Sequence, residues 1–165
     1  MRWPLWLTCV RRRHHSVEFP SRYVRTSPPW KGITITGLTP YLSFPGTARQ
    51  ALAFYREVFG GELVLNTLAD FGRDDGPTDA IAHGMLRGTV ELFASDSAPG
   101  EPSLHIAGLV FALLGTAEPS TLEAWFAALG DGGSDIDPLQ LRPWGDHDGQ
   151  VTDRFGVRWL IGYQG

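Results

Sequence analysis

Hydrophobic and polar positions follow a helical rhythm in the segment from Thr47 to Gly61. Polar side chains face one side of this segment, and apolar side chains recur at three- and four-residue spacing on the other, at Ala48, Ala51, Leu52, Tyr55, Val58 and Phe59. Thr47 is a suitable N-cap, and the pair Gly60-Gly61 is a typical stop signal. The pattern therefore predicts an amphipathic helix from Thr47 to about Phe59 that packs one face on a sheet.

The segments around this helix have the composition of strands. Residues 33–44 and 62–68 are rich in β-branched, aromatic and aliphatic side chains, and residues 69–79 form an acidic, glycine-containing loop. Residues 80–87 and 89–94 predict a hairpin that turns at Arg87-Gly88. The order is strand, helix and three strands.

The same order begins again after residue 103. Residues 106–114 predict a buried strand, and residues 119–129 predict a helix that ends in the glycine-rich segment 130–133. Residues 135–163 are long enough for three short strands. We therefore predict an α+β fold of two β-α-β-β-β modules, residues 33–98 and 104–165, within one domain over residues 33–165.

Charge divides the chain at about residue 32. The first 32 residues hold seven basic residues and one acidic residue, whereas the remainder holds seven basic and 17 acidic residues. An acidic body repels phosphate backbones, so we expect no nucleic-acid partner. Residues 1–32 lack a sustained helix or strand period, so a disordered basic tail is expected there. An organellar presequence, an RNA- or membrane-touching arm and an incorrectly chosen start codon all remain open.

Several chemistries lack their motif in this sequence. The single cysteine, Cys9, excludes an intramolecular disulfide and fits a cytoplasmic location. The longest apolar run, residues 108–114, is too short to cross a bilayer, so no membrane association is expected. Dinucleotide, P-loop and nucleophile-elbow motifs are missing, and we expect no cofactor.

The order of motifs resembles the PhnB-like branch of the vicinal oxygen chelate superfamily, which groups glyoxalases, bleomycin-resistance proteins and extradiol dioxygenases. The strings that carry the resemblance are PYLSFPGTARQALAFYREVFGGE, IAHGMLRG, ELFASD, LGDGG and, after Trp144-Gly145, DRFGVRW. It covers residues 33–165. The resemblance implies that the two modules form a curved mixed sheet around a cavity, commonly completed in a homodimer.

The resemblance also implies four strand positions for metal ligands, typically His or Gln, Glu, His and Glu. They fall near Pro40, on Glu91, within residues 108–114 and on Leu160, with His105 slightly too early for the third. Only Glu91 has a matching side chain. One carboxylate holds a divalent ion too weakly, so we predict no metal site.

The hairpin decides which polar side chains share a face. A two-residue turn at Arg87-Gly88 would pair Gly84 with Glu91 and place Ala82, Gly84, Leu86, Glu91 and Phe93 on one face. Small residues beside a carboxylate would leave room for a ligand. His83 would lie on the other face, where a hydrogen-bonded core histidine is the plainer role, although a one-residue bulge would turn it into the cavity.

Several other side chains fit either a binding role or a simpler structural role. Tyr41, Trp144 and Trp159 could form aromatic walls for a flat ligand, although the core is the favoured place for each. His147 and Asp148 fit a solvated turn that could place an acid or base. Asp153 fits a carboxylate that shapes the last turn, and Asp96 at a strand end is also interpreted as structural.

These observations predict a protein that binds a small organic molecule without a catalytic metal. The ligand-binding candidates are Glu91, Tyr41, His83, Trp144 and Trp159, with Glu91 meeting a polar or cationic group. The alternative is a metal-dependent lyase, isomerase or dioxygenase in which Glu91 and His105 or His83 bind an ion together with ligands from a dimer partner. A third possibility is a scaffold for another protein.

Overall fold

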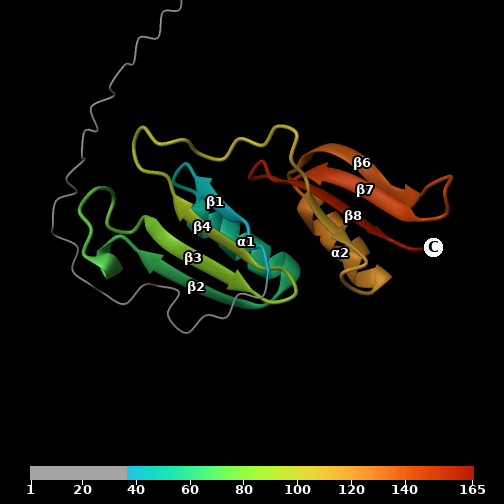
Figure 1. Cartoon of the computed structure of the whole chain (residues 1–165), viewed down its shortest axis with the longest axis horizontal. Helices are drawn as coiled ribbons and strands as arrows, with labels where there is room; N and C mark the ends of the chain where they lie inside the picture. Colours follow the sequence, from blue (N-terminus) through green and yellow to red (C-terminus); the bar gives the residue numbers. More distant parts are fainter. Residues whose placement is uncertain (1–36) are drawn as a thin grey trace, which may run out of the picture. The chain divides into compact units, whose positions relative to one another are not determined.

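The computed structural model describes residues 37–165, which form two successive β-α-β-β-β modules (Figure 1). The first module contains β1 (Tyr41–Phe44), α1 (Ala48–Phe59), β2 (Glu62–Thr67), the short 3-10 helix η1 (Ala69–Phe71), β3 (Ile81–Arg87) and β4 (Leu92–Asp96). The second contains β5 (Phe111–Leu114), α2 (Pro119–Gly130), β6 (Ser134–Leu141), β7 (His147–Thr152) and β8 (Arg158–Tyr163). The predicted α+β class and the repeated module are confirmed.

Each module builds one four-stranded mixed sheet. Sheet A has the order β1-β4-β3-β2 and sheet B the order β5-β8-β7-β6. In both sheets the first and last strands of the module run parallel, and the remaining neighbours are antiparallel. A parallel pair needs a long crossover, and the helix and two intervening strands supply it.

Helix α1 begins where the sequence predicts, but its cap comes from elsewhere. Thr47 occupies the N-cap position without a side-chain hydrogen bond. Instead, the Asp96 carboxylate at the end of β4 accepts the Ala48 N–H at 2.9 Å and the Ile81 N–H at 2.8 Å. A negative group at a helix N-terminus satisfies a free amide and complements the helix dipole. The structural role predicted for Asp96 is thereby confirmed.

Helix α1 covers one face of sheet A. A side chain at Gly84 would collide with the Leu52 side chain of α1, and Leu86, two residues further along β3, is fully buried. Because alternate residues of a strand point to opposite faces, His83, Met85 and Arg87 belong to the other face. This second face of sheet A is called the helix-free face below.

The predicted hairpin register is wrong. Residues Leu86 and Gly84 of β3 pair with Leu92 and Ala94 of β4, so the connection is longer than two residues. The offset is an odd number of residues, which reverses the facing of β4 relative to β3. The space beside Gly84 is therefore filled by the Leu52 side chain and is not available to a ligand. Phe93 lies with His83 on the helix-free face.

Other element boundaries also differ from the prediction. Strand β1 begins only at Tyr41, and β5 only at Phe111; residues 33–36 of the predicted first strand and the whole predicted tail lie outside the described residues. His147, expected in a turn, begins β7 and stacks on Tyr163. The Arg142 N–H donates to the Asp146 carbonyl and closes the turn between β6 and β7 at Asp146. His147 therefore lies just after the turn, in the strand.

A buried carboxylate ties the second module to the first. Asp153, 3% exposed, accepts the backbone N–H groups of Phe155 and Val157 and so shapes the β7–β8 turn, as predicted. Its other oxygen accepts the Tyr55 hydroxyl of α1 and the Trp159 indole N–H of β8, each at 2.8 Å. Burial and the adjacent carboxylate raise the pKa of Tyr55 well above its ordinary value, so its proton stays in place.

Candidate functional site

Three rings gather on the helix-free face of sheet A: Tyr41 from β1, His83 from β3 and Phe93 from β4. We call them the ring cluster. Tyr41 stacks on His83 with 5.5 Å between ring centroids, and Phe93 meets both rings edge-on. The strand register explains the assembly, because Tyr41 pairs with Phe93 across the parallel ladder and Met85 pairs with Phe93 across the antiparallel one. Tyr41 is 50% exposed and forms the accessible rim.

His83 lies beneath this rim and is only 6% exposed. Its Nδ1 shares a hydrogen bond of 3.0 Å with the Tyr41 hydroxyl, whereas its Nε2 is shielded from solvent and has no partner among the described residues. Burial lowers the pKa of His83, so the neutral imidazole is the stable form. A buried polar atom without a partner costs about 1–3 kcal/mol.

Beyond the ring cluster, the helix-free face continues to a cation. The Arg87 guanidinium contacts the Met85 sulfur at 3.7 Å, which places both side chains on this face. Glu62 pairs with Arg87 across the β2–β3 ladder, yet no ion pair within 4.0 Å joins them in the described structure. The face thus combines aromatic surface, a neutral imidazole and a positive charge.

The structure brings together only two of the five residues that the sequence named as ligand-binding candidates. Tyr41 and His83 share the ring cluster. Glu91 is exposed in the β3–β4 connection, just before β4 begins. Trp159 is 1% exposed and packs in the core against Phe59 and Phe111, so it takes the favoured alternative. Trp144 is 68% exposed in the β6–β7 turn, which contradicts the core position favoured for it.

The four positions implied for metal ligands do not form a suitable donor set. Pro40 precedes β1 and Leu160 lies in β8, and neither side chain can ligate. Glu91 and His105 are exposed on separate segments. Within residues 37–165, no three His, Cys, Asp or Glu side chains lie close enough together to hold a metal ion. The described residues therefore do not fit a metal of the kind that the resemblance implies.

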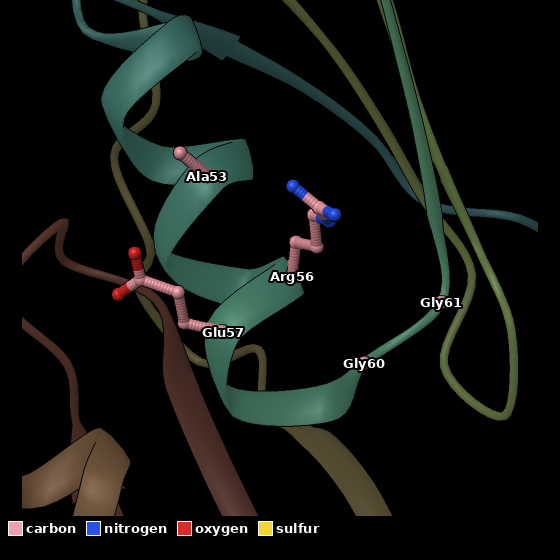
Figure 2. A pocket seen from close by; sticks show the side chains of 5 residues that line it. All are labelled: Ala53, Arg56, Glu57, Gly60 and Gly61. Atoms are coloured by element: carbon pink, nitrogen blue, oxygen red, sulfur yellow. The ribbon is translucent and has the colours of Figure 1, made fainter.

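A separate hollow of about 380 Å³ lies at the C-terminal end of α1 (Figure 2). It is lined by Ala53, Arg56, Glu57, Gly60 and Gly61, and the Arg56 and Glu57 side chains point away from each other. Both side chains are exposed, and no orphaned polar atom faces the hollow. The ring cluster is the better candidate, because it holds a buried polar atom that lacks a partner.

The sequence match assigns this fold to a family. The sequence-family model described as Glyoxalase/Bleomycin resistance protein/Dioxygenase superfamily matches residues 37–161, from the segment before β1 into β8. The chain belongs to this superfamily, as the order of its motifs predicts.

Known relatives extend the match across most of the chain. Protein YjdN of Escherichia coli is 31% identical over 139 residues, which cover 75% of this chain and 92% of YjdN. The crystal structure of PA1353 from Pseudomonas aeruginosa is 34% identical, with a TM-score of 0.64 over 79% of this chain and 98% of that one. A PhnB protein from Bacillus cereus, 21% identical, shares the fold with a TM-score of 0.65 over 76% of this chain and 98% of its own. No helix among residues 37–165 is long and apolar enough to span a membrane.

Sequence reasoning missed Phe93 as a partner of His83 and missed Arg87 altogether. A signal for Arg87 was present, because His83, Met85 and Arg87 alternate along one strand and must share a face. Phe93 required the true hairpin register, which the sequence pattern misplaced.

Proposed function

We propose that the protein binds a small organic molecule at the ring cluster of sheet A. The observation that supports this proposal is the buried Nε2 of His83, which has no partner among the described residues although it lies beneath a half-exposed aromatic rim. A ligand atom that reaches Nε2 would remove the cost of the orphaned group. Aromatic enclosure with a few directed polar groups is typical of small-molecule sites.

The chemistry of the cluster favours recognition by one directed hydrogen bond. When the Tyr41 hydroxyl donates to Nδ1, the imidazole proton resides on Nε2 and is offered to an acceptor. Tyr41 and Phe93 would enclose the apolar part of the ligand. The polar or cationic contact predicted for Glu91 remains a prediction, since that carboxylate lies in the exposed connection before β4.

We further propose that a homodimer completes the cavity. Leu113 and Leu114 are neighbours in β5 and so point to opposite faces of sheet B, and Leu113 is the one buried in the core. Leu114 shares its face with Gly162 and Asp148, because a side chain at Gly162 would contact both. Leu114 is 56% exposed on a strand. A large apolar side chain there favours burial against a second copy.

The proposal includes binding without a catalytic metal, because the described donor set is unsuitable. Elemental analysis of untagged protein purified without chelator, paired with thermal melts before and after excess EDTA, tests this point. We expect no near-stoichiometric metal and an unchanged melting temperature. Near-stoichiometric metal together with a lower melting temperature after EDTA would instead favour the metal-dependent enzyme.

Ligand binding itself is tested by a thermal-shift screen of small organic molecules against the full chain. Hits are expected to lose their stabilising effect in Tyr41→Ala and to keep it in Trp144→Ala, because Trp144 is an exposed aromatic outside the ring cluster. Hits that survive Tyr41→Ala and are lost in Trp144→Ala would place the ligand at the β6–β7 turn and contradict the proposed site.

A further inference from the structure

We propose that the ligand of this site is a planar aromatic molecule with an anionic group, and that Arg87 binds the anion while the ring cluster contacts the ring. The inference rests on the proposed function and specifies the chemical class of the ligand. It departs from the sequence-based expectation of a polar or cationic group at Glu91.

Arg87 is the residue that would bind the anionic group of the ligand. Its guanidinium contacts the Met85 sulfur and pairs with no carboxylate within residues 37–165. A guanidinium stays charged at all ordinary pH values and offers a planar fork that matches a carboxylate in two-point contact. By contrast, Arg142 in sheet B is already held by Asp137 and Asp148.

The other charged groups near this face do not oppose an anion strongly. Glu62 is the cross-strand neighbour of Arg87, but it is exposed and not bridged to it. Glu91 lies in the exposed connection before β4. His83 is neutral because burial lowers its pKa. Arg87 is therefore the cation that contacts the Met85 side chain next to the rings, and Glu62 at its cross-strand position is the carboxylate that partly offsets its charge.

The ring cluster would contact the aromatic ring of the ligand. Stacked and edge-on contacts within the cluster show that its faces and edges already match aromatic partners, and half of Tyr41 remains open. Along β3, Met85 is two residues from His83, which corresponds to about 7 Å at ~3.3 Å per residue. Because the Arg87 guanidinium folds back onto Met85, a ligand of two fused rings has about the length that separates His83 from the cation along β3.

The experiment uses three probes of one shape and different charge: 2-naphthoate, 2-naphthamide and the cation 2-naphthylmethylammonium. Their affinities for the full chain are measured by titration calorimetry, in wild type, in Arg87→Gln and in Tyr41→Ala. The matched control is Arg56→Gln, since Arg56 is an exposed arginine of α1 on the helix-covered side of the sheet.

We expect 2-naphthoate to bind wild type roughly tenfold or more tightly than the other two probes, as a charge-assisted contact allows. Arg87→Gln should abolish this preference, Arg56→Gln should keep it, and Tyr41→Ala should weaken all three probes. Raising the salt concentration should weaken only the naphthoate.

Two results would overturn the inference in different ways. If the amide or the cation binds as tightly as naphthoate, in a Tyr41-dependent manner and without an effect of Arg87→Gln, the anion inference fails while the proposed function stands. If none of the three probes binds wild type while the thermal-shift screen gives hits that depend on Tyr41, the planar aromatic class is wrong and the proposed function stands; if the screen gives no such hits either, the proposed function fails as well.

Discussion

At the scale of the residue, Asp153 shows how one buried charge can be tolerated. Its two oxygens accept four hydrogen bonds, from two backbone amides of its own turn and from the side chains of Tyr55 and Trp159. A buried carboxylate is costly unless its lone pairs are satisfied in this way. The same residue therefore fixes a local turn and joins α1 to the second module.

Asp153→Asn should be destabilising, because both carboxylate oxygens accept hydrogen bonds and an amide has only one acceptor oxygen. The NH2 group of Asn would face N–H or O–H donors and could not accept from them. We expect the free energy of unfolding to fall by about 3 kcal/mol. Urea denaturation near neutral pH measures the loss. Asp146→Asn, at an exposed aspartate in the β6–β7 turn, should be nearly neutral; equal stability of the two variants would show that the buried network contributes little.

His83 should make the protein less stable in mild acid. Burial lowers its pKa below the ordinary value of 6.5, so below that pH the unfolded chain takes up a proton that the native state resists. Stability that is fully present above about pH 6.5 is therefore lost as the pH falls.

The variant His83→Gln should consequently lose less stability than wild type between about pH 7 and about pH 5. Denaturant melts at both pH values measure the difference, and His105→Gln at an exposed histidine controls for the loss of a histidine. An identical pH dependence in wild type and His83→Gln would contradict the assignment.

At the scale of the element, the edge strand β6 depends on a glycine in its neighbour. The β6–β7 pairing has register shifts on both sides of Asp137, so β6 pairs irregularly with β7 there. A side-chain carbon at Gly149 would lie 2.5 Å from the Leu139 backbone nitrogen and 2.8 Å from the Asp137 carbonyl oxygen. Backbone obstacles cannot rotate away, unlike the Leu52 methyl group at Gly84.

Gly149→Ala should therefore push β6 away and lower the free energy of unfolding by about 2 kcal/mol. Hydrogen exchange should locate the loss in β6, and thermal melts should give its size. Gly37→Ala, where a new methyl group meets nothing within 4 Å, is the control. Unchanged protection of β6 would mean that the strand adapts without cost.

At the scale of the whole molecule, the proposed homodimer makes a specific prediction about Leu114. Glutamate at this exposed strand position would place a charge in the interface, where burial without a partner is costly. Leu114→Glu should therefore shift sedimentation from dimer to monomer at matched concentration. Leu38→Glu, at a residue 99% exposed before β1, should leave the dimer intact; a wild-type monomer, or a dimer indifferent to Leu114→Glu, would contradict the proposal.

Much of the fold was predictable because its signals are local. The limits of α1 follow from its apolar spacing and its Gly60-Gly61 stop, and the turn role of Asp153 follows from its place before Phe155-Gly156. The site was less predictable. Tyr41 and His83 were named singly, but their contact joins residues 42 positions apart, and no local pattern encodes such a pairing.

By itself the sequence determined the order of the two modules, the class of fold and the family, since helical and strand periods are properties of neighbouring residues. Only the tertiary structure decided which face of sheet A each side chain occupies. The physical reason is the two-residue period of a strand: an odd shift in the β3–β4 register reverses every side chain of β4 relative to β3. That shift brings Phe93 to His83, leaves Glu91 in the exposed connection, and leaves Arg87 as the cation beside the rings.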